Sequence, residues 1–268
     1  MSSTEPHAPV FPAQPPASLT DPAVIREHDW NAFSQLPAMT NHWERPGWRP
    51  GRRSYHWLLA FDDEPALAGL ARRCQQALRH LPLDLVPLDS LHLTLVRVGF
   101  IDELTPQRAD VVAQAVVDRC GGLPVFPLAI GPLAGSRGAI RFSVTPWDGL
   151  VEIRRRLHAA ASDALNGGRP AGHVDSFRPH VSIAYCDRDL PAAPVVQAVA
   201  PLRRLAPVTV HVRALNLVVL RREGRAYHWH VHTTVPLNGP ARPRPPEPIR
   251  WGRQDDASGR LHQGRQPG

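Results

Sequence analysis

Apolar and polar residues alternate along several short runs of this chain, and such alternation is typical of strands with one buried face. Other segments place apolar residues every three or four positions, which predicts helices with one apolar side. The predicted strands are 54–61, 90–98, 124–130, 139–145, 177–185, 207–221 and 226–236. The predicted helices are 64–80, 105–119, 148–166 and 192–203. Because strands and helices are mixed along the chain, the pattern predicts an α+β fold.

The regions outside this alternating domain differ from it in composition. Residues 1–20 contain many Pro, Ala, Ser and Thr, and we expect them to be disordered. The Asp-Pro pair at 21–22 predicts the start of a short helix, because aspartate caps helices and proline fits their first turn. Residues 21–50 are rich in Trp and Pro, and we expect them to pack on the domain at 51–238. The Pro- and Arg-rich tail at 239–268 is expected to be disordered.

A short polar pattern occurs twice within the predicted strands. Thr94 follows His92 by two residues, and Ser182 follows His180 by two residues. Residues two apart on a strand point to the same side, so each copy presents an imidazole and a hydroxyl on one face. A single copy is more often the solvent side of a sheet, and the doubling favours a catalytic interpretation. Two such strands across a groove would supply the acid, the base and the hydrogen-bond donors for attack at phosphorus.

Other residues near the two patterns are candidates for ligand contacts. Arg178 lies two residues before the second histidine, which predicts a guanidinium on the same face, where it can bind phosphate. Strand parity places Arg97 and Tyr185 on the faces opposite their histidines, in the core or at the rim, unless a bulge intervenes. Trp43 and Trp48 can stack on a base, but an apolar anchor for the N-terminal extension is the favoured role.

The doubled His-x-Thr/Ser pattern resembles the paired signatures of the two-histidine (2H) phosphoesterase superfamily. Within it, the chain is similar to proteins named 2′-5′ RNA ligases or RNA 2′,3′-cyclic phosphodiesterases, over roughly residues 52–237. The resemblance implies two pseudo-symmetric lobes around a central groove, each an antiparallel sheet with packed helices that gives one motif to the groove. Tyr-His-Trp, which occurs at 55–57 and again at 227–229, fits such a duplication.

This resemblance also implies an activity. The chain is then a metal-independent phosphodiesterase without a cofactor that opens 2′,3′-cyclic phosphates to 2′-phosphomonoesters, with 2′-5′ RNA ligation as the reverse reaction. His92 and His180 are its catalytic residues, and Thr94, Ser182 and Arg178 bind the phosphate. RNA 3′ ends, tRNA fragments, ADP-ribose cyclic phosphate and small nucleotides all fit as substrates. Which histidine is the base stays open, because the two roles exchange with the direction of reaction.

The charged residues exclude two other chemistries. The chain has a net charge of +7, and all 31 of its basic residues are arginines. Arginine suits phosphate recognition, although a GC-rich coding sequence is the favoured cause of the bias. Without lysine, the chain cannot use the P-loop lysine of NTPases or a lysine–nucleotide intermediate of ligases.

Cysteines and apolar runs indicate where the protein works. Cys74, Cys120 and Cys186 are too scattered for a disulfide framework or a zinc site, so a reducing cytoplasm is the default. No apolar run approaches the about 18–20 residues of a membrane span, and the N-terminus does not resemble a signal peptide. We therefore expect a cytoplasmic monomer without a membrane partner.

Two alternative functions stay open. His228, His230 and His232 alternate along the last predicted strand, and three imidazoles on one face can hold zinc or copper. The sequence shows no carboxylate or cysteine beside them, which weakens this interpretation. The second alternative is a non-catalytic RNA- or nucleotide-binding module, against which the intact pairs of histidines and hydroxyls argue.

Overall fold

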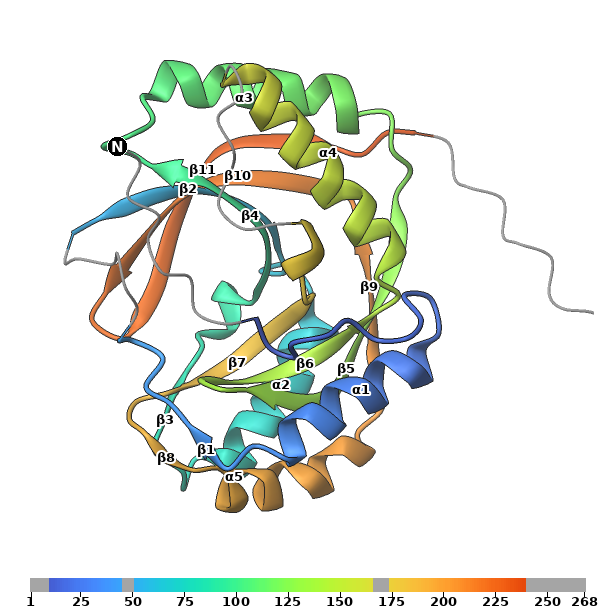
Figure 1. Ribbon diagram of the computed structural model, residues 1–268, viewed down its shortest axis with the longest axis vertical. Coiled ribbons are helices and arrows are strands. Elements are labelled where there is room, and N and C mark those ends of the chain that lie inside the picture. Colours follow the sequence, from blue (N-terminus) through green and yellow to red (C-terminus); the bar gives the residue numbers. More distant parts are fainter. Residues whose placement is uncertain (1–9, 45–50, 166–173, 240–268) are drawn as a thin grey trace, which may run out of the picture.

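Two antiparallel sheets, one above the other in Figure 1, organise the computed structural model, which describes residues 10–44, 51–165 and 174–239. The helices are α1 (Pro22–Ser34), α2 (Pro65–Leu78), α3 (Pro106–Cys120), α4 (Asp148–Ala164) and α5 (Ala192–Val199), with 3₁₀ turns η1 (Leu88–Ser90), η2 (Val174–Ser176) and η3 (Ala200–Arg204). The strands are β1 (Ala38–Met39), β2 (Arg53–Ala60), β3 (Leu83–Leu85), β4 (His92–Phe100), β5 (Phe126–Ser136), β6 (Ala139–Thr145), β7 (His180–Cys186), β8 (Leu190–Pro191), β9 (Val208–Val212), β10 (Ala214–Glu223) and β11 (Ala226–Pro236).

We name the two lobes after the strands that carry the histidine motifs. The β4 lobe contains the sheet β11-β10-β2-β4 with helices α3 and α4. The β7 lobe contains the sheet β3-β7-β6-β5-β9 with helices α1, α2 and α5. The named strands of both sheets pair antiparallel. The protein therefore has the α+β fold that the sequence pattern predicted, in the two sheet-and-helix lobes that the family resemblance implied.

Two helices are exchanged between the lobes. The chain between β2 and β4, which are neighbours in the β4 lobe, forms α2 and β3, and both lie in the other lobe, where α2 packs against β7 and β9. The helix α4 connects β6 to β7 of the β7 lobe, yet it packs against α3 and β4. One cluster of buried apolar side chains consequently runs through both lobes and includes Leu93 of β4 and Val181 of β7.

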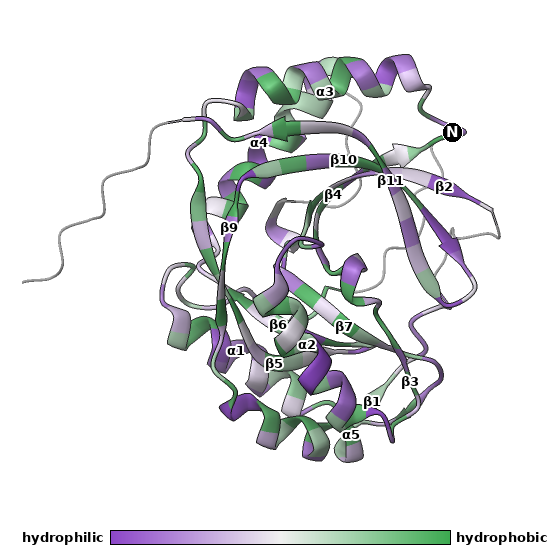
Figure 2. Ribbon diagram, turned by 180° about the vertical axis from the view of Figure 1, so that it is seen from behind, coloured by the Kyte–Doolittle hydropathy of each residue, from purple (hydrophilic) through white to green (hydrophobic). Residues whose placement is uncertain are grey.

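The helices form where the sequence supplies caps and one apolar side. Asp21 caps α1, because its carboxylate accepts the N–H groups of Ala23 and Val24 at 2.8 and 3.3 Å. Hydrophobic and hydrophilic residues alternate along α3 in Figure 2, as expected of a helix with one buried side. No helix within the described ranges is long and apolar enough to cross a membrane.

The predicted strand 207–221 is two strands in different sheets. Its first part is β9, which pairs with β5 in the β7 lobe. Its second part is β10, which pairs with β2 and β11 in the β4 lobe. The chain passes from one lobe to the other at Arg213. The buried apolar positions change parity at this residue, from Val210 and Val212 to Leu215 and Leu217, and this change marks the switch of pairing partner.

Residues 10–20, which we call the N-terminal strap, lie ordered on the β7 lobe. The main-chain N–H of Trp147 donates to the carbonyl of Leu19 at 2.7 Å. The guanidinium of Arg178 donates to the carbonyls of Pro12 and Ala13 at 3.0 and 3.1 Å. The expectation of disorder is therefore wrong for these residues, because buried donors of the domain use their carbonyls as acceptors. Residues 1–9 and 240–268 lie outside the described residues.

The repeated Tyr-His-Trp does not mark equivalent positions of two lobes. Both copies lie in the sheet of the β4 lobe, one on β2 and one on β11. Trp57 of the first copy belongs to the main core, whereas Trp229 of the second packs against a separate small cluster. The pseudo-symmetry lies instead in the motif strands and in the exchanged helices.

Candidate active site

The two motif strands approach each other where the lobes meet. The strands β4 and β7 are in contact without pairing, and each begins with its motif histidine. The charge of His92 affects the pKa of His180, so the two imidazoles are electrostatic neighbours. A small pocket beside His92 is lined by residues of both lobes, including Tyr185 and Tyr227. The fold thus brings together the two histidines that the sequence singled out.

Both imidazoles are oriented in the same way. Nδ1 of His92 lies 2.9 Å from the carbonyl oxygen of Ser90, and Nδ1 of His180 lies 2.7 Å from the carbonyl oxygen of Arg178. A carbonyl oxygen only accepts hydrogen bonds, so each Nδ1 carries the proton. In each neutral ring, Nε2 is therefore the atom with the available lone pair. The carbonyl two residues before each histidine fixes its tautomer.

Burial keeps both imidazoles neutral at pH 7. Burial and, to a smaller extent, the nearby charge of Arg141 lower the pKa of His180 to about 3. The pKa of His92 is also lowered by burial, while its hydrogen bond to the Ser90 carbonyl acts in the opposite direction. Each ring can therefore accept a proton at Nε2, and a bound anion would favour the protonated form of either.

The motif hydroxyls differ in exposure. Thr94 is exposed, whereas Ser182 is buried and only 7% exposed. Strand parity puts each on the side of its histidine, since Leu93 and Val181 between them point into the core. Each lobe therefore presents an imidazole and a hydroxyl on the side away from the core.

A β-bulge follows the hydroxyl residue of β4. Residues 57 and 58 of β2 pair with Val96 and Thr94, so Leu95 has no partner. Beyond this extra residue the parity of the strand is reversed. Arg97 pairs with residue 56, two positions from the partner of Thr94, and therefore points to the same side as Thr94. Arg97 therefore does not lie opposite its histidine, because the bulge that the prediction excepted turns its side chain to the motif face, where its guanidinium lies 4.7 Å from the centroid of the Phe100 ring.

An equivalent bulge follows the hydroxyl residue of β7. Residues 140 and 141 of β6 pair with Ala184 and Ser182, so Ile183 is the extra residue. Tyr185 pairs with residue 139, two positions from the partner of Ser182, and so it too points to the motif face. Tyr185 therefore does not lie opposite its histidine either, because this bulge reverses the strand parity on which that prediction was based. The two motifs match in their histidine, their hydroxyl and the position of the bulge.

Arg141 is a charged group of this face that sequence reasoning missed. It pairs with Ser182 across the sheet and is only 3% exposed. Its Nε donates to the carbonyl of Gly135 at 3.3 Å, and its Nη2 donates to that of Phe11 at 3.4 Å. A signal existed, since Arg141 is the charged residue on the polar face of this strand, which it shares with Ser143 and Thr145.

Arg178 does not occupy the position predicted for it. Its guanidinium donates to the carbonyls of Pro12 and Ala13 in the strap, and to those of Asp175 and Phe177 in its own loop. These contacts contradict the expected phosphate contact, because they engage all three guanidinium nitrogens. Parity did not apply to this residue, since β7 begins only at the histidine. Arg178 contributes to the site through its main-chain carbonyl, which is hydrogen-bonded to Nδ1 of His180, rather than through its guanidinium.

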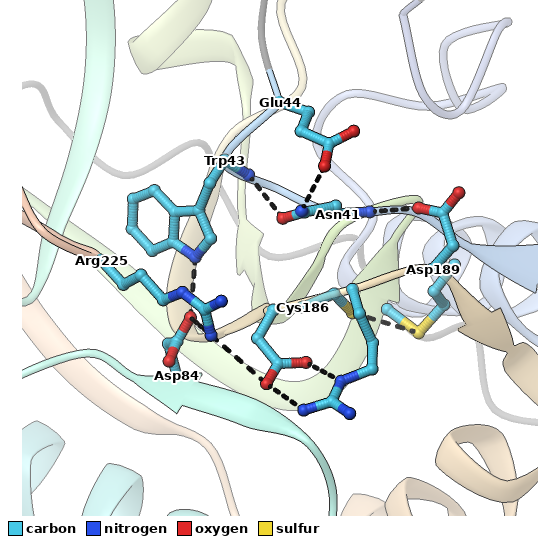
Figure 3. A network of polar contacts seen from close by, with 10 residues as sticks. Asn41, Trp43, Glu44, Asp84, Cys186, Asp189 and Arg225 are labelled. Carbon is cyan, nitrogen blue, oxygen red and sulfur yellow. Dashed lines mark hydrogen bonds and ion pairs between the residues drawn. The ribbon is translucent and has the colours of Figure 1, made fainter. Parts of the chain in front are cut away.

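An aromatic cluster joins the lobes at one end of the site. The imidazole of His42 stacks on Tyr185 with ring centroids 3.8 Å apart and is hydrogen-bonded to the Tyr227 hydroxyl at 3.0 Å. Figure 3 shows Trp43 in this region, with its indole N–H donating to Asp84 at 2.7 Å. Trp43 is 9% exposed and also packs on both tyrosines. It is therefore a contact between extension and domain, while Trp48 lies outside the described residues.

The three histidines of β11 do not form a metal site. A bulge at His232 interrupts their alternation, and this residue instead lies 2.8 Å from Asp110 of α3. Within the described ranges, no three His, Cys, Asp or Glu side chains are grouped so that they could hold a metal ion. His228 and His230 therefore lack a third ligand there.

The cysteines are not candidate nucleophiles. Cys74, Cys120 and Cys186 are buried and unpaired. Burial raises the pKa of the first two to about 11 and that of Cys186 to about 12. They are therefore thiols rather than thiolates at neutral pH.

Comparison with known proteins agrees with this architecture. The model of the 2′-5′ RNA ligase superfamily matches residues 61–226, a segment that contains both motif strands and ends before Trp229. No curated protein matches the sequence. The fold is similar to that of E. coli LigT complexed with NADP⁺ (15% identity, TM-score 0.51) and with 3′-AMP (13% identity, TM-score 0.50), each covering 69% of this chain and 98% of LigT. At these identities the likeness shows the fold alone.

Proposed function

The chain belongs to the 2′-5′ RNA ligase superfamily, and from this membership we propose that it is a metal-independent phosphodiesterase that opens 2′,3′-cyclic phosphates of RNA 3′ ends or nucleotides. The observation that carries the proposal is the matched orientation of His92 and His180. In each, Nδ1–H donates a hydrogen bond to a main-chain carbonyl, and Nε2 is left for proton transfer. Attack at phosphorus needs one such group on each side, because one proton is removed and another is delivered.

In this reaction one neutral imidazole takes a proton at Nε2 from the attacking water. The other, as an imidazolium, gives its Nε2 proton to the ribose oxygen that leaves phosphorus. The new P–O bond forms as the old one breaks, and by family resemblance the product is a 2′-phosphomonoester. When a ribose hydroxyl attacks the cyclic phosphate in place of water, each imidazole keeps its role, and the two roles exchange when the reaction runs back to the cyclic phosphate.

The developing negative charge needs donors and cations on the motif face. The hydroxyls of Thr94 and Ser182 can donate hydrogen bonds to the non-bridging oxygens. Arg97 and Arg141 supply positive charge there, because the bulge brings in the first and strand pairing places the second beside Ser182. This assignment replaces Arg178, because carbonyls engage all three of its guanidinium nitrogens, whereas in Arg141 they engage Nε and Nη2.

The deciding experiment is turnover of a panel of cyclic phosphates by the purified protein. The panel contains nucleoside 2′,3′-cyclic phosphates, an RNA that ends in one, and ADP-ribose cyclic phosphate. We expect hydrolysis of at least one nucleoside or RNA substrate, unchanged by a chelator. Binding without turnover would favour the non-catalytic nucleotide-binding alternative, and activity that a chelator abolishes and zinc restores would reject the metal-independent mechanism.

A further inference from the structure

The side chain of Trp229 stands directly against one of the motif histidines. Its ring centroid lies 5.0 Å from that of His92, and the two ring planes meet at 68°. Trp229 is on β11 and His92 is on β4, at opposite edges of one sheet. Contact between them requires the sheet to curl, so that side chains on its inner face converge. The indole is therefore a neighbour of the reacting phosphate in the proposed mechanism.

A small apolar cluster supports this indole. Leu58 and Val218 are fully buried, Leu220 is 3% exposed, and Trp229 packs against them. They lie on the inner side of the sheet of the β4 lobe, since Leu58 pairs across the sheet with Thr94. The cluster is separate from the main core. A planar ring resting on such a support is held in place, and it keeps a half-buried surface toward the site.

The other aromatic rings beside the pocket are engaged by the protein itself. His42 from the extension stacks on Tyr185, which is 7% exposed. Tyr227 contacts His42, Trp43 and Tyr185. The N-terminal extension thus occupies the ring faces at that end of the site. Trp229 differs from these residues, because its contacts are the motif histidine and an apolar support.

We propose that Trp229 is the platform on which the nucleobase of the substrate stacks. This inference rests on the proposed function and specifies its substrate class. In a nucleoside 2′,3′-cyclic phosphate, the base is attached to C1′, the carbon next to the one that carries the 2′ oxygen. A ring in contact with the imidazole at phosphorus is therefore within one sugar of the base. Bases with larger π-faces stack more strongly, so purine substrates are preferred to pyrimidine substrates.

The proposal also separates two substrates that the sequence leaves open. A cyclic phosphate on a ribose that carries a base at C1′ can place this base on Trp229. The terminal ribose of ADP-ribose 1″,2″-cyclic phosphate carries no base, since C1″ itself bears a phosphate oxygen. We therefore expect this compound to be a poorer substrate than adenosine 2′,3′-cyclic phosphate.

The test compares kcat/KM for adenosine 2′,3′-cyclic phosphate and for methyl ribofuranoside 2,3-cyclic phosphate, which lacks the base. Trp229→Leu should lower kcat/KM for the adenosine substrate by about 5- to 150-fold, the equivalent of ~1–3 kcal/mol for one stacked base. It should leave the base-free substrate unchanged. Trp229→Phe, which keeps a smaller ring, should retain part of the preference. Trp30→Leu is the control, because Trp30 lies beside Arg203 in the β7 lobe.

The other outcomes overturn the proposal or locate its failure. An equal loss for both substrates would mean that Trp229 only holds His92 in place. Equal kcat/KM of the wild-type protein for both substrates would also overturn the proposal. If the wild type turns over no cyclic phosphate, calorimetric binding of 2′-AMP replaces the rate. Binding weakened about 5- to 150-fold by Trp229→Leu would then retain the platform and reject the phosphodiesterase, and unchanged binding would reject both.

Discussion

The buried guanidinium of Arg154 donates a hydrogen bond to the carbonyl of Leu95, the extra residue of the β4 bulge. The other lobe repeats this arrangement. The side-chain amide of Gln75 donates to the carbonyl of Ile183, the extra residue of the β7 bulge, at 3.0 Å, and to that of Val86 at 2.7 Å. The two donors lie on α4 and α2, the helices that the lobes exchange. Each exchanged helix therefore holds the bulge of the sheet on which it packs.

The first prediction tests this link between helix and bulge. Gln75→Leu removes the amide donor of a side chain that is only 8% exposed. A buried carbonyl that loses its partner costs about 1–3 kcal/mol, so the free energy of unfolding should fall by this amount. Because the bulge sets the parity of β7, kcat should fall by about tenfold as well.

The control for this prediction is Gln76→Leu, which changes the adjacent, exposed glutamine of the same helix. It should leave both kcat and the denaturant midpoint near the wild-type values. Equal behaviour of the two variants would show that the amide does not hold the bulge.

The second prediction concerns the catalytic pair. His92→Ala and His180→Ala should each lower kcat by about 10²- to 10⁴-fold, the usual contribution of a general acid or base. The double variant should be little worse than either single one, because the two groups act as a unit. Circular dichroism and melting temperature serve as the check on folding. Near-wild-type turnover by either single variant would end the proposed mechanism.

Alternation of residues was sufficient to predict the motif strands, whereas the approach of two histidines from different lobes was implied by the family resemblance. It could not predict the bulges, since one extra residue changes parity without changing composition. The trace left in the sequence is two consecutive buried apolar residues, Leu95-Val96 in β4 and Ile183-Ala184 in β7. Such pairs also occur in buried strands without a bulge, so only the register of the neighbouring strand identifies them.

Long-range contacts explain the other differences between sequence and structure. Arg178 faces the strap because residues far earlier in the chain supply the carbonyls that its guanidinium needs. The strap itself has the composition of a disordered segment, and its order comes from buried donors such as this one. The exchange of α2 and α4 is likewise invisible in the pattern, since an apolar face does not specify which sheet it covers.

The third prediction distinguishes two arginines. Arg97→Gln should lower kcat/KM by about tenfold or more with little change in melting temperature, because this side chain points to the motif face and is half-buried. Arg178→Gln should chiefly lower the melting temperature, since it releases the strap carbonyls. Steady-state kinetics and thermal unfolding of both variants give the comparison. The reverse pattern would return the phosphate-binding role to Arg178.

The fourth prediction is an acidic optimum for kcat/KM. The mechanism needs one neutral and one protonated histidine, and kcat/KM reports the pKa values of the free enzyme. Burial lowers the pKa of His180 to about 3 and that of His92 below its usual 6.5. Above the higher of these two pKa values, the fraction of free enzyme with one protonated histidine decreases tenfold per pH unit. The pH profile should therefore peak below pH 6.5, and an optimum above pH 7.5 would contradict it.

The last prediction concerns acid stability and uses His56, a buried residue whose Nε2 lies 2.8 Å from the Ser54 hydroxyl. Burial lowers the pKa of His56 to about 3, and the charges of Arg97 and His92 act in the same direction. Between pH 6.5 and about 3, the unfolded chain binds a proton at this site that the folded protein does not bind. The free energy of unfolding should therefore decrease as the pH falls, by up to about 1.4 kcal/mol per pH unit for each such group.

His56→Gln removes one of these groups and keeps a side chain that can hydrogen-bond to Ser54. Urea unfolding between pH 7.5 and 4.5 should show a shallower loss of stability for the variant than for the wild type, with the two curves diverging only below pH 6.5. His180, whose pKa burial also lowers to about 3, continues to titrate in both proteins, so a residual slope must remain. Because the difference appears only where unfolded histidine binds protons, it separates proton linkage from a simple packing defect. A difference in stability that is the same at every pH would mean that His56 contributes packing alone.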